Sequence, residues 1–266
     1  MQPDDRLSAI LGHWNAMDAA VADVTSTTWG AVVTDPTSPE IWDVNYARVD
    51  SDDPGLRLAH IEAEASAALA DAGARRFHVA LMRPDGPIDL LADLSARGDR
   101  VRWELVMAVG LTGARAPEEL GITELDPGEA VFDDVLRATN AAFGVDDPVV
   151  ARQLRAIDRR MRSLGKRYFC VPDPTGPGGV AAVAALVPGE GVAYVDNVVT
   201  FPHARGRGLA TALVGTVLEH AALGGASDAY LLADRTGPVQ LYERLGFREI
   251  SRIASTLSPA PPTVRS

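Results

Sequence analysis

The sequence contains few residues that could form a disulfide framework or a metal centre. Its 266 residues include one cysteine, Cys170, and five histidines that show no HExxH spacing. A single cysteine cannot form an intrachain disulfide, and these histidines do not match a zinc motif. We therefore predict no metal site. We expect Cys170, in an apolar run, to be a buried strand residue, with a reactive thiol as the alternative.

Positive charge is also scarce. The chain has 25 Lys and Arg residues against 36 Asp and Glu residues, a net charge of -11, and Lys166 is its only lysine, a bias that we attribute to composition rather than to function. The sequence offers no diffuse basic surface for nucleic acid or an anionic membrane. No apolar run reaches the roughly 18 residues of a membrane helix, and the first residues are acidic where a secretory signal is basic. We expect a cytoplasmic protein without a nucleic-acid or membrane partner.

The length and composition predict two folded domains. The chain is 47% hydrophobic and 23% charged, as in globular proteins, and it exceeds the usual size of one domain. Residues 111–121 contain Gly, Pro and charged residues without apolar periodicity, so we place the boundary there. The predicted domains are 1–115 and 116–258, followed by a Pro-rich disordered tail, 259–266.

The hydrophobic periodicity predicts a mixed α/β fold in both domains. In the first domain we expect helices at 7–21, 56–73 and 88–96, and strands at 25–33, 41–49, 77–82 and 101–109. In the second we expect helices at 128–143, 148–164, 209–223 and 238–245, and strands at 122–125, 167–171, 180–187, 192–200, 229–233 and 248–257.

The segment that joins the strand 192–200 to the helix 209–223 carries the strongest functional signal. It contains Arg205, Gly206, Arg207 and Gly208. Glycines let a ligand approach the backbone, and the free N–H groups of a helix N-terminus attract anions. Arginines add charge-assisted hydrogen bonds to phosphate. We therefore predict a pyrophosphate site. The alternatives are an ordinary glycine turn and a dinucleotide fingerprint, although Thr211 stands where the latter needs a third glycine.

Two motifs together resemble the GNAT superfamily of N-acetyltransferases. The first runs from Arg205 to Ala210, as R/Q-x-x-G-x-G/A, and the second from Leu241 to Phe247, as L-Y-x-x-x-G-F. The resemblance covers residues 121–257 and implies a mixed, mostly antiparallel sheet flanked by helices, with acetyl-CoA as cosubstrate. It implies that the cofactor-binding residues are Val198, Val199, Thr200, Arg205, Gly206, Arg207, Gly208, Leu209 and Ala210.

The resemblance also indicates catalytic residues. Tyr242 matches the family's tyrosine that donates a proton to the departing thiolate; the alternative is a core aromatic residue. The acceptor amine must lose a proton, and strand alternation places Tyr194, Asp196, Val198 and Thr200 on one face. Asp196 is our candidate base, with a hydrogen-bonded strand residue as the alternative. Glutamate is frequent in this role in the family and is absent here.

The first domain resembles a smaller, degenerate copy of the same fold. Where the phosphate loop belongs, residues 50–55 include three aspartates, which would repel pyrophosphate. We predict that acyl-CoA does not bind there.

The predicted function is N-acetylation of a primary amine, with a small cationic molecule as the acceptor because the chain is acidic. The alternatives are a non-catalytic acyl-CoA sensor and an enzyme that acetylates proteins or peptides. A homodimer is left open.

Overall fold

A computed structural model describes residues 3–114, 121–126, 128 and 130–258, and the chain forms two compact units. The larger unit consists of Met1–His13 and Met107–Ile250, and the smaller unit of Trp14–Val106 and Ser251–Ser266. The predicted boundary at 115/116 and the predicted tail fall on residues 115–120 and 259–266, outside the described residues, so both stay predictions. The predicted fold class, a mixed α/β fold, is confirmed.

The larger unit is a mixed sheet between two layers of helices. Its strands, in spatial order, are β6 (Thr123–Glu124), β7 (Arg167–Pro172), β8 (Val180–Pro188), β9 (Val192–Thr200), β10 (Asp228–Asp234) and the end of β5 (Val101–Gly110). Its helices are α4 (Ala130–Ala142), α5 (Pro148–Met161), α6 (Leu209–Leu223) and α7 (Val239–Arg244), with short 3-10 turns at Arg162–Leu164, Pro177–Gly179 and Pro202–Ala204. The start of β11 (Arg248–Ser258) also belongs to this unit.

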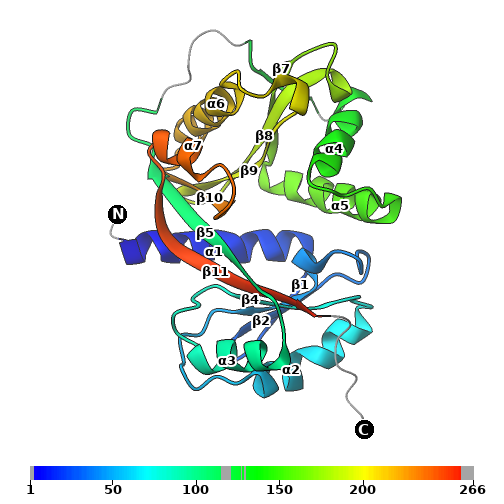
Figure 1. The fold of residues 1–266 in the computed structure, drawn as a ribbon, viewed down its shortest axis with the longest axis vertical. Coiled ribbons are helices and arrows are strands. Elements are labelled where there is room, and N and C mark those ends of the chain that lie inside the picture. Colours follow the sequence, from blue (N-terminus) through cyan, green and yellow to red (C-terminus); the bar gives the residue numbers. More distant parts are fainter. Residues whose placement is uncertain (1–2, 115–120, 127, 129, 259–266) are drawn as a thin grey trace. The chain divides into compact units, whose positions relative to one another are not determined.

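The central strand β8 explains why helices cover both faces of this sheet. Its first eight residues are small or aliphatic and all are buried, as in strands that are covered on both sides. Helix α6 lies against one face, and α4 and α5 lie on the other side (Figure 1). Helix α5 begins with Pro148, and the Asp147 side chain accepts hydrogen bonds from the amides of Val149 and Val150, a standard helix N-cap.

The first residues of helix α1 (Pro3–Val21) complete the larger unit. Arg6 forms an ion pair of 2.7 Å with Asp228, at the start of β10. The hydroxyl of Tyr230 lies 3.2 Å from Nδ1 of His13, and both side chains are buried. Gly189 packs so closely on His13 that an added Cβ would lie 2.6 Å from the imidazole ring.

The smaller unit contains further strands of the same 11-stranded mixed sheet. Its strands, in spatial order, are β1 (Asp23–Ser26), β2 (Gly30–Thr34), β3 (Tyr46–Val49), β4 (Phe77–Leu81), the end of β11 and the start of β5. Its helices are the rest of α1, α2 (Leu58–Asp71) and α3 (Ile88–Arg97), with a 3-10 turn at Trp42–Val44. The core contains fully buried Ile61, Leu69, Phe77, Leu90 and Leu94.

Two predicted strands of the smaller unit are wrong in detail. The predicted strand 25–33 is a hairpin, because the chain turns between β1 and β2, where the amide of Thr27 bonds to the carbonyl of Gly30 at 3.0 Å. The predicted strand 41–49 begins as the turn Trp42–Val44 and is extended only in β3. Apolar and β-branched residues are common in both places, so composition alone did not reveal the turns.

Each unit is completed by a strand from the other half of the sequence. In the larger unit, β10 has the end of β5 as its neighbour. In the smaller unit, β4 pairs antiparallel with β11, from Leu81 opposite Ala254 to Phe77 opposite Ser258.

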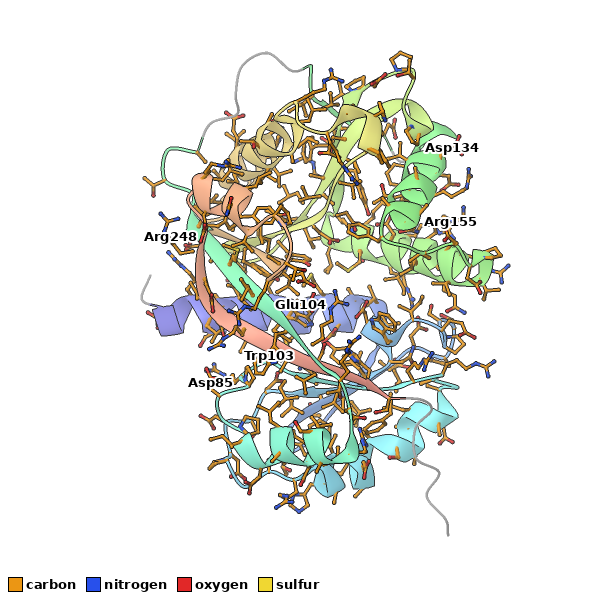
Figure 2. The ribbon with its side chains drawn as sticks, viewed as in Figure 1. Asp85, Trp103, Glu104, Asp134, Arg155 and Arg248 are labelled. Carbon is orange, nitrogen blue, oxygen red and sulfur yellow. The ribbon has the colours of Figure 1, made fainter. Side chains whose placement is uncertain are left out.

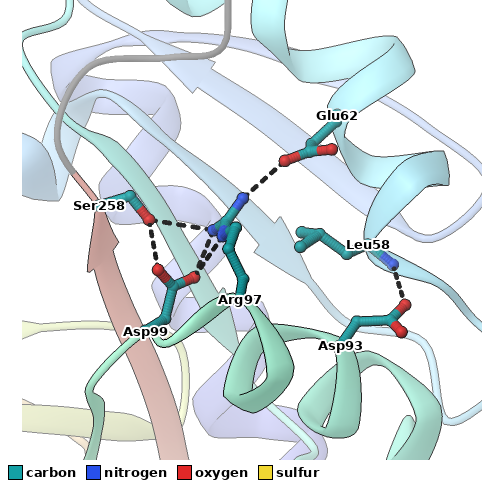
Figure 3. A network of polar contacts seen from close by, with 6 residues as sticks. All are labelled: Leu58, Glu62, Asp93, Arg97, Asp99 and Ser258. Atoms are coloured by element: carbon teal, nitrogen blue, oxygen red, sulfur yellow. Dashed lines mark hydrogen bonds and ion pairs between the residues drawn. The ribbon is translucent and has the colours of Figure 1, made fainter.

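A polar network fixes the end of β11 in the smaller unit (Figure 3). The hydroxyl of Ser258 donates to Asp99 at 3.0 Å and accepts from Arg97 at 3.0 Å, and Arg97 also donates to Glu62 on α2 at 2.6 Å. The same picture shows Asp93 of α3 accepting from the amide of Leu58, at the start of α2, at 3.0 Å.

Candidate active site

The candidate site lies where two parallel strands of the larger unit separate. Strands β9 and β10 pair only from Val192 to Tyr194 and from Asp228 to Tyr230. Beyond that point, all residues of both strands are described and the structure shows no further pairing between them. The rest of β9 therefore presents backbone groups on the side that β10 leaves.

A β-bulge lies at the point of separation. Ala185 and Val183 of β8 are two residues apart, but their partners on β9, Asp196 and Val199, are three residues apart. Strand β9 thus carries one extra residue there. Asn197 has a left-handed backbone, with φ of 51°, and no other described non-glycine residue has a positive φ.

The bulge overturns the predicted alternation of side chains on β9. Asp196 and Val199 oppose Ala185 and Val183, which lie two apart and face the same side of β8. Tyr194 and Asp196 therefore share their face with Val199, whereas Val198 and Thr200 point to the opposite face. The extra residue reverses the alternation, and a strict period of two cannot anticipate it.

The predicted phosphate loop is open. Gly206 and Gly208 both have φ of 77°, and a Cβ added to either would meet no atom within 4 Å. Gly208 is the N-cap of α6 and receives no side-chain cap. The first amides of a helix have no carbonyl partner within the helix, so this N-terminus can bind an anion.

One contact links this loop to the end of β9. Arg205 donates from Nε to the carbonyl of Thr200 at 3.2 Å, which fixes the arginine beside the strand. The Thr200 hydroxyl is buried and has no hydrogen-bond partner in the described part of the chain. A buried hydroxyl without a partner is unfavourable, and a polar ligand alongside β9 would supply one. The residues present thus fit a long phosphorylated cofactor.

Tyr242, the second predicted catalytic residue, lies on α7. It is 7% exposed, and its ring contacts that of Phe247 edge to face, with centroids 5.9 Å apart. Burial raises the pKa of Tyr242, so the phenol keeps its proton at neutral pH. Arg248, labelled in Figure 2, bonds to the carbonyls of Glu243 and Phe247 at 3.1 and 2.8 Å and holds the end of α7.

Asp196 is held by a partner that the sequence analysis did not connect with it. One carboxylate oxygen accepts from Lys166 Nζ at 2.9 Å, and the other accepts from the amide of Asn197 at 2.8 Å. The Asp196 side chain remains 26% exposed, whereas that of Lys166 is 7% exposed. No hydrogen bond joins Asp196 to Tyr242 among the described contacts, so the two predicted catalytic residues are not in direct contact.

Lys166 belongs to a buried polar cluster with Asp158, Tyr168, Asp196 and Asn197. Lys166 lies 3.4 Å from Asp158, Tyr168 donates to Asp158 at 2.6 Å, and Asn197 donates to the Tyr168 hydroxyl at 3.0 Å. Burial opposes the ammonium charge of Lys166, but Asp196 and Asp158 outweigh burial and raise its pKa well above the ordinary value. Burial also raises the pKa of Tyr168.

Two signals in the sequence pointed to this cluster. Lys166 is the only lysine of the chain, a bias that we had attributed to composition. Asp158 is the only acidic residue of α5, which carries four arginines, and the only buried residue of that helix. An acidic residue on an otherwise basic helix indicates a specific partner, but the sequence does not identify it.

The structure adds two general observations. In the described ranges, no group of three or more His, Cys, Asp or Glu side chains could hold a metal ion. No described helix combines the length and the apolar character needed to cross a lipid bilayer.

Comparisons with known proteins identify the family of this region. The profile of the acetyltransferase (GNAT) family matches residues 132–247, which include β9, the glycine loop and Tyr242. No protein of curated function matches the chain.

Two solved GNAT structures show the same fold, and a third is similar to part of the chain. A GCN5-related N-acetyltransferase from Kribbella flavida is 20% identical, with a TM-score of 0.62, over 96% of this chain and 95% of that one. A tandem GNAT protein from the clavulanic acid biosynthesis pathway is 17% identical, with a TM-score of 0.56, over 82% and 76% of the two chains. A GNAT-family structure from Novosphingobium aromaticivorans is 28% identical, with a TM-score of 0.45, over 62% of this chain; the present chain spans 66% of its length.

Proposed function

Because residues 132–247 are a GNAT acetyltransferase domain, we propose that this protein transfers an acetyl group from acetyl-CoA to a primary amine. The observation that carries the proposal is that β9 is not paired with β10 beyond Tyr194 and leads to two phosphate-loop glycines with open space around them. This arrangement suits an extended ligand that has a phosphorylated end.

The cosubstrate would be held along β9 and α6. Backbone groups of Val198, Val199 and Thr200 would bind the pantetheine arm, and the amides and arginines from Arg205 to Ala210 would bind the pyrophosphate. Acetyl-CoA supplies an acetyl thioester, which an amine can attack. The Thr200 hydroxyl, which has no partner among the described residues, is available to this ligand.

The proposed catalytic residues supply and remove protons. Tyr242 keeps its proton at neutral pH because it is buried, and it is proposed to donate that proton to the departing sulfur. Asp196 is proposed to accept a proton from the attacking amine, directly or through water. Its partly exposed carboxylate can be reached from solvent, as this role requires.

The acceptor is proposed to be a small molecule with a primary amine. The net charge of -11 favours the approach of a cationic amine by long-range attraction. Close to the bulge, Lys166 offsets part of this negative charge. The test must therefore include neutral and carboxylate-bearing amines beside polyamines.

Release of free thiol from acetyl-CoA tests the proposal, with polyamines, aminoglycosides, amino acids and peptides as acceptors. Transfer to one class supports it. Binding of acetyl-CoA without transfer to any acceptor would indicate a sensor, and transfer to peptides alone a protein acetyltransferase; either result contradicts the proposal.

The Tyr242→Phe variant tests the role of the phenol. We expect kcat to fall about 10²-fold, the lower end for general acid catalysis, while the Kd of acetyl-CoA stays the same, because only the hydroxyl is removed. Glu243→Gln, an exposed neighbour on the same helix, is the matched control and should keep its kcat. An unchanged kcat in Tyr242→Phe would assign this residue to the core alone.

A further inference from the structure

We propose that Lys166 is a positioning residue for the acceptor amine: it holds the Asp196 carboxylate in one orientation at the bulge of β9. This inference rests on the proposed function, because it concerns the step in which the amine is bound and loses its proton. It assigns a role to the only lysine of the chain.

The geometry fixes the carboxylate at both oxygens. Lys166 Nζ donates to Oδ2 of Asp196 at 2.9 Å, and the amide of Asn197 donates to Oδ1 at 2.8 Å. Two donors on different oxygens define the plane of the carboxylate. Each oxygen can accept another hydrogen bond, and the side chain is 26% exposed, so an amine or a water molecule can still reach it.

Contacts with Asp158 and Tyr168 hold the lysine side chain in place. Its side chain is 7% exposed and lies 3.4 Å from Asp158 on α5, whose side chain is 8% exposed. Asp158 accepts from the Tyr168 hydroxyl at 2.6 Å and also faces Arg162, at 3.5 Å. The ammonium lies 5.1 Å from the centre of the Tyr168 ring, within the range of a cation–π contact.

The hydrogen bonds form a closed ring that includes the bulge. Asn197 donates to the hydroxyl of Tyr168, Tyr168 donates to Asp158, Asp158 pairs with Lys166, and Lys166 pairs with Asp196, the residue before Asn197. This ring joins α5, β7 and β9. The left-handed backbone of Asn197 is unfavourable by itself, and the ring offsets that cost by bonding both its side chain and its amide.

Opposite charges meet in this cluster. Two carboxylates, Asp158 and Asp196, face two cations, Lys166 and Arg162. The Lys166 ammonium can only donate hydrogen bonds, so it occupies one acceptor position of Asp196 and leaves the remaining positions to the amine. Lys166 is sealed from solvent, so its effect on the amine passes through Asp196.

The test compares steady-state kinetics of variants in the full-length protein. Lys166→Met alone would leave the Asp158 charge buried without its closest cation, which endangers folding. The double variant Lys166→Met with Asp158→Asn avoids this, because an asparagine oxygen can still accept from Tyr168. We expect kcat/KM for the amine identified by the thiol assay to fall about 10²-fold, as for a misplaced reacting group, with the Kd of acetyl-CoA unchanged.

Two further variants separate positioning from a purely structural role. Lys166→Arg keeps the charge and should restore at least a tenth of the wild-type kcat/KM. Asp134→Asn makes the same acid-to-amide change on α4. Asp134, labelled in Figure 2, is 55% exposed. It pairs only with Arg137 among the described residues. This control should retain wild-type kinetics.

Magnetic resonance gives a readout that does not depend on turnover. Because the chain has one lysine, protein labelled with ¹⁵N-lysine has a single side-chain ammonium signal, which is that of Lys166. We expect this signal to shift when Asp196 is changed to Asn and when the acceptor amine is added to the complex with CoA. Addition of CoA alone should move it less.

The outcomes separate this inference from the proposed function. If wild-type protein neither binds acetyl-CoA nor releases thiol, the proposed function fails. If wild-type protein is active and the folded double variant keeps kcat/KM within about twofold, Lys166 does not position the acceptor and the inference is overturned. An ammonium signal that the amine leaves unchanged would also overturn it.

Discussion

The two units contain equivalent pairs of parallel strands, and only one pair is open. In the larger unit β9 leads through the glycine loop and α6 to β10, and the two strands separate after Tyr194 and Tyr230. In the smaller unit β3 leads through residues 50–57 and α2 to β4. There the pairing continues from Ala47 opposite Val79 to Val49 opposite Leu81, and the Met82 amide bonds to the carbonyl of Val49 at 2.9 Å.

The connecting loops differ in the same way. Space is open above Gly206 and Gly208. In the smaller unit a Cβ added to Gly86 would lie 2.4 Å from Cα of Asp52, and the Asp89 amide bonds to the carbonyl of Pro54 at 3.2 Å. The loop 50–55 therefore packs on the segment after β4. The same succession of elements can thus end in separated strands with an open loop or in paired strands with a packed loop.

The largest effect is expected when the phosphate loop, residues 205–208, receives the negative charge that the loop 50–55 carries. In the double variant Arg205→Asp with Arg207→Asp, two cations that would bind phosphate become anions. Hydrogen bonds to charged groups contribute about 1.5–3 kcal/mol each, so the Kd of acetyl-CoA should rise at least about 10²-fold. Isothermal titration calorimetry measures this change, and an unchanged Kd would contradict the phosphate site.

The reverse exchange sharpens the comparison. Asp52→Arg with Asp53→Arg gives the smaller unit a basic loop, but β3 and β4 stay paired. Titration should still show one bound acetyl-CoA per chain. A second binding site would mean that charge alone had kept the smaller unit empty.

A glycine-to-alanine substitution should have different effects at Gly86 and at Gly206, because their surroundings differ. Gly86→Ala places a methyl group against the backbone of Asp52 and should lower the free energy of unfolding by about 2–3 kcal/mol, as in overpacked cores, without changing acetyl-CoA binding. Gly206→Ala meets no atom but has a φ of 77°, so it should cost about 1 kcal/mol and weaken binding. Urea unfolding and calorimetry separate the two; equal effects on both properties would refute the contrast.

The closed core of the smaller unit should also be sensitive to pH. His78 is buried beside Tyr46, and its Nδ1 lies 2.8 Å from the carbonyl of Thr256; burial lowers the pKa of His78 to about 4. The unfolded chain binds a proton there below about pH 6.5. The stability from neutral His78 is therefore present above pH 6.5 and is lost as the pH falls towards 4, by at most about 3 kcal/mol.

A variant isolates this contribution. Burial raises the pKa of Asp18 to about 6, which has the opposite sign, because it favours the folded state as the pH falls from 6 towards 4. The difference in stability between wild type and His78→Gln removes the Asp18 effect. This difference should shrink between pH 7 and pH 4.5; a constant difference would mean that His78 does not titrate in this range.

The last effect concerns the bulge on β9. Asn197→Ala loses the hydrogen bond to Tyr168 and keeps the strained backbone, so it should cost about 1–2 kcal/mol in unfolding free energy. Asn197→Gly loses the same bond but relieves the strain, so it should cost less. Equal costs would show that the left-handed backbone carries no strain.

The sequence was sufficient to predict most helices and strands and the position of the glycine loop between β9 and α6. Helix α6 was predicted with its observed bounds, 209–223, because its apolar residues recur at helical spacing. The identification of the GNAT domain is confirmed by the family match to residues 132–247. The roles of Tyr242, Asp196 and the loop residues stay predictions.

Longer-range features were not predictable from one sequence. The bulge at Asn197 depends on pairing with β8, and pairing partners leave no trace in local periodicity. The cluster around Lys166 joins residues 158, 166, 168, 196 and 197 from three elements. The position of β11 beside β4 brings residues together across more than 170 positions, a distance over which composition carries no information.

The strand exchange between the two halves of the sequence sets an order of completion during translation. The smaller unit begins at Trp14, but its strand β4 needs Ala254–Ser258, which leave the ribosome more than 170 residues after β4. Until then β4 lacks its neighbour and presents an unpaired edge, which favours aggregation. The half that is synthesised first is thus finished last. A ribosome that stalls after the acetyltransferase domain would release a chain in which β4 has not yet paired with β11.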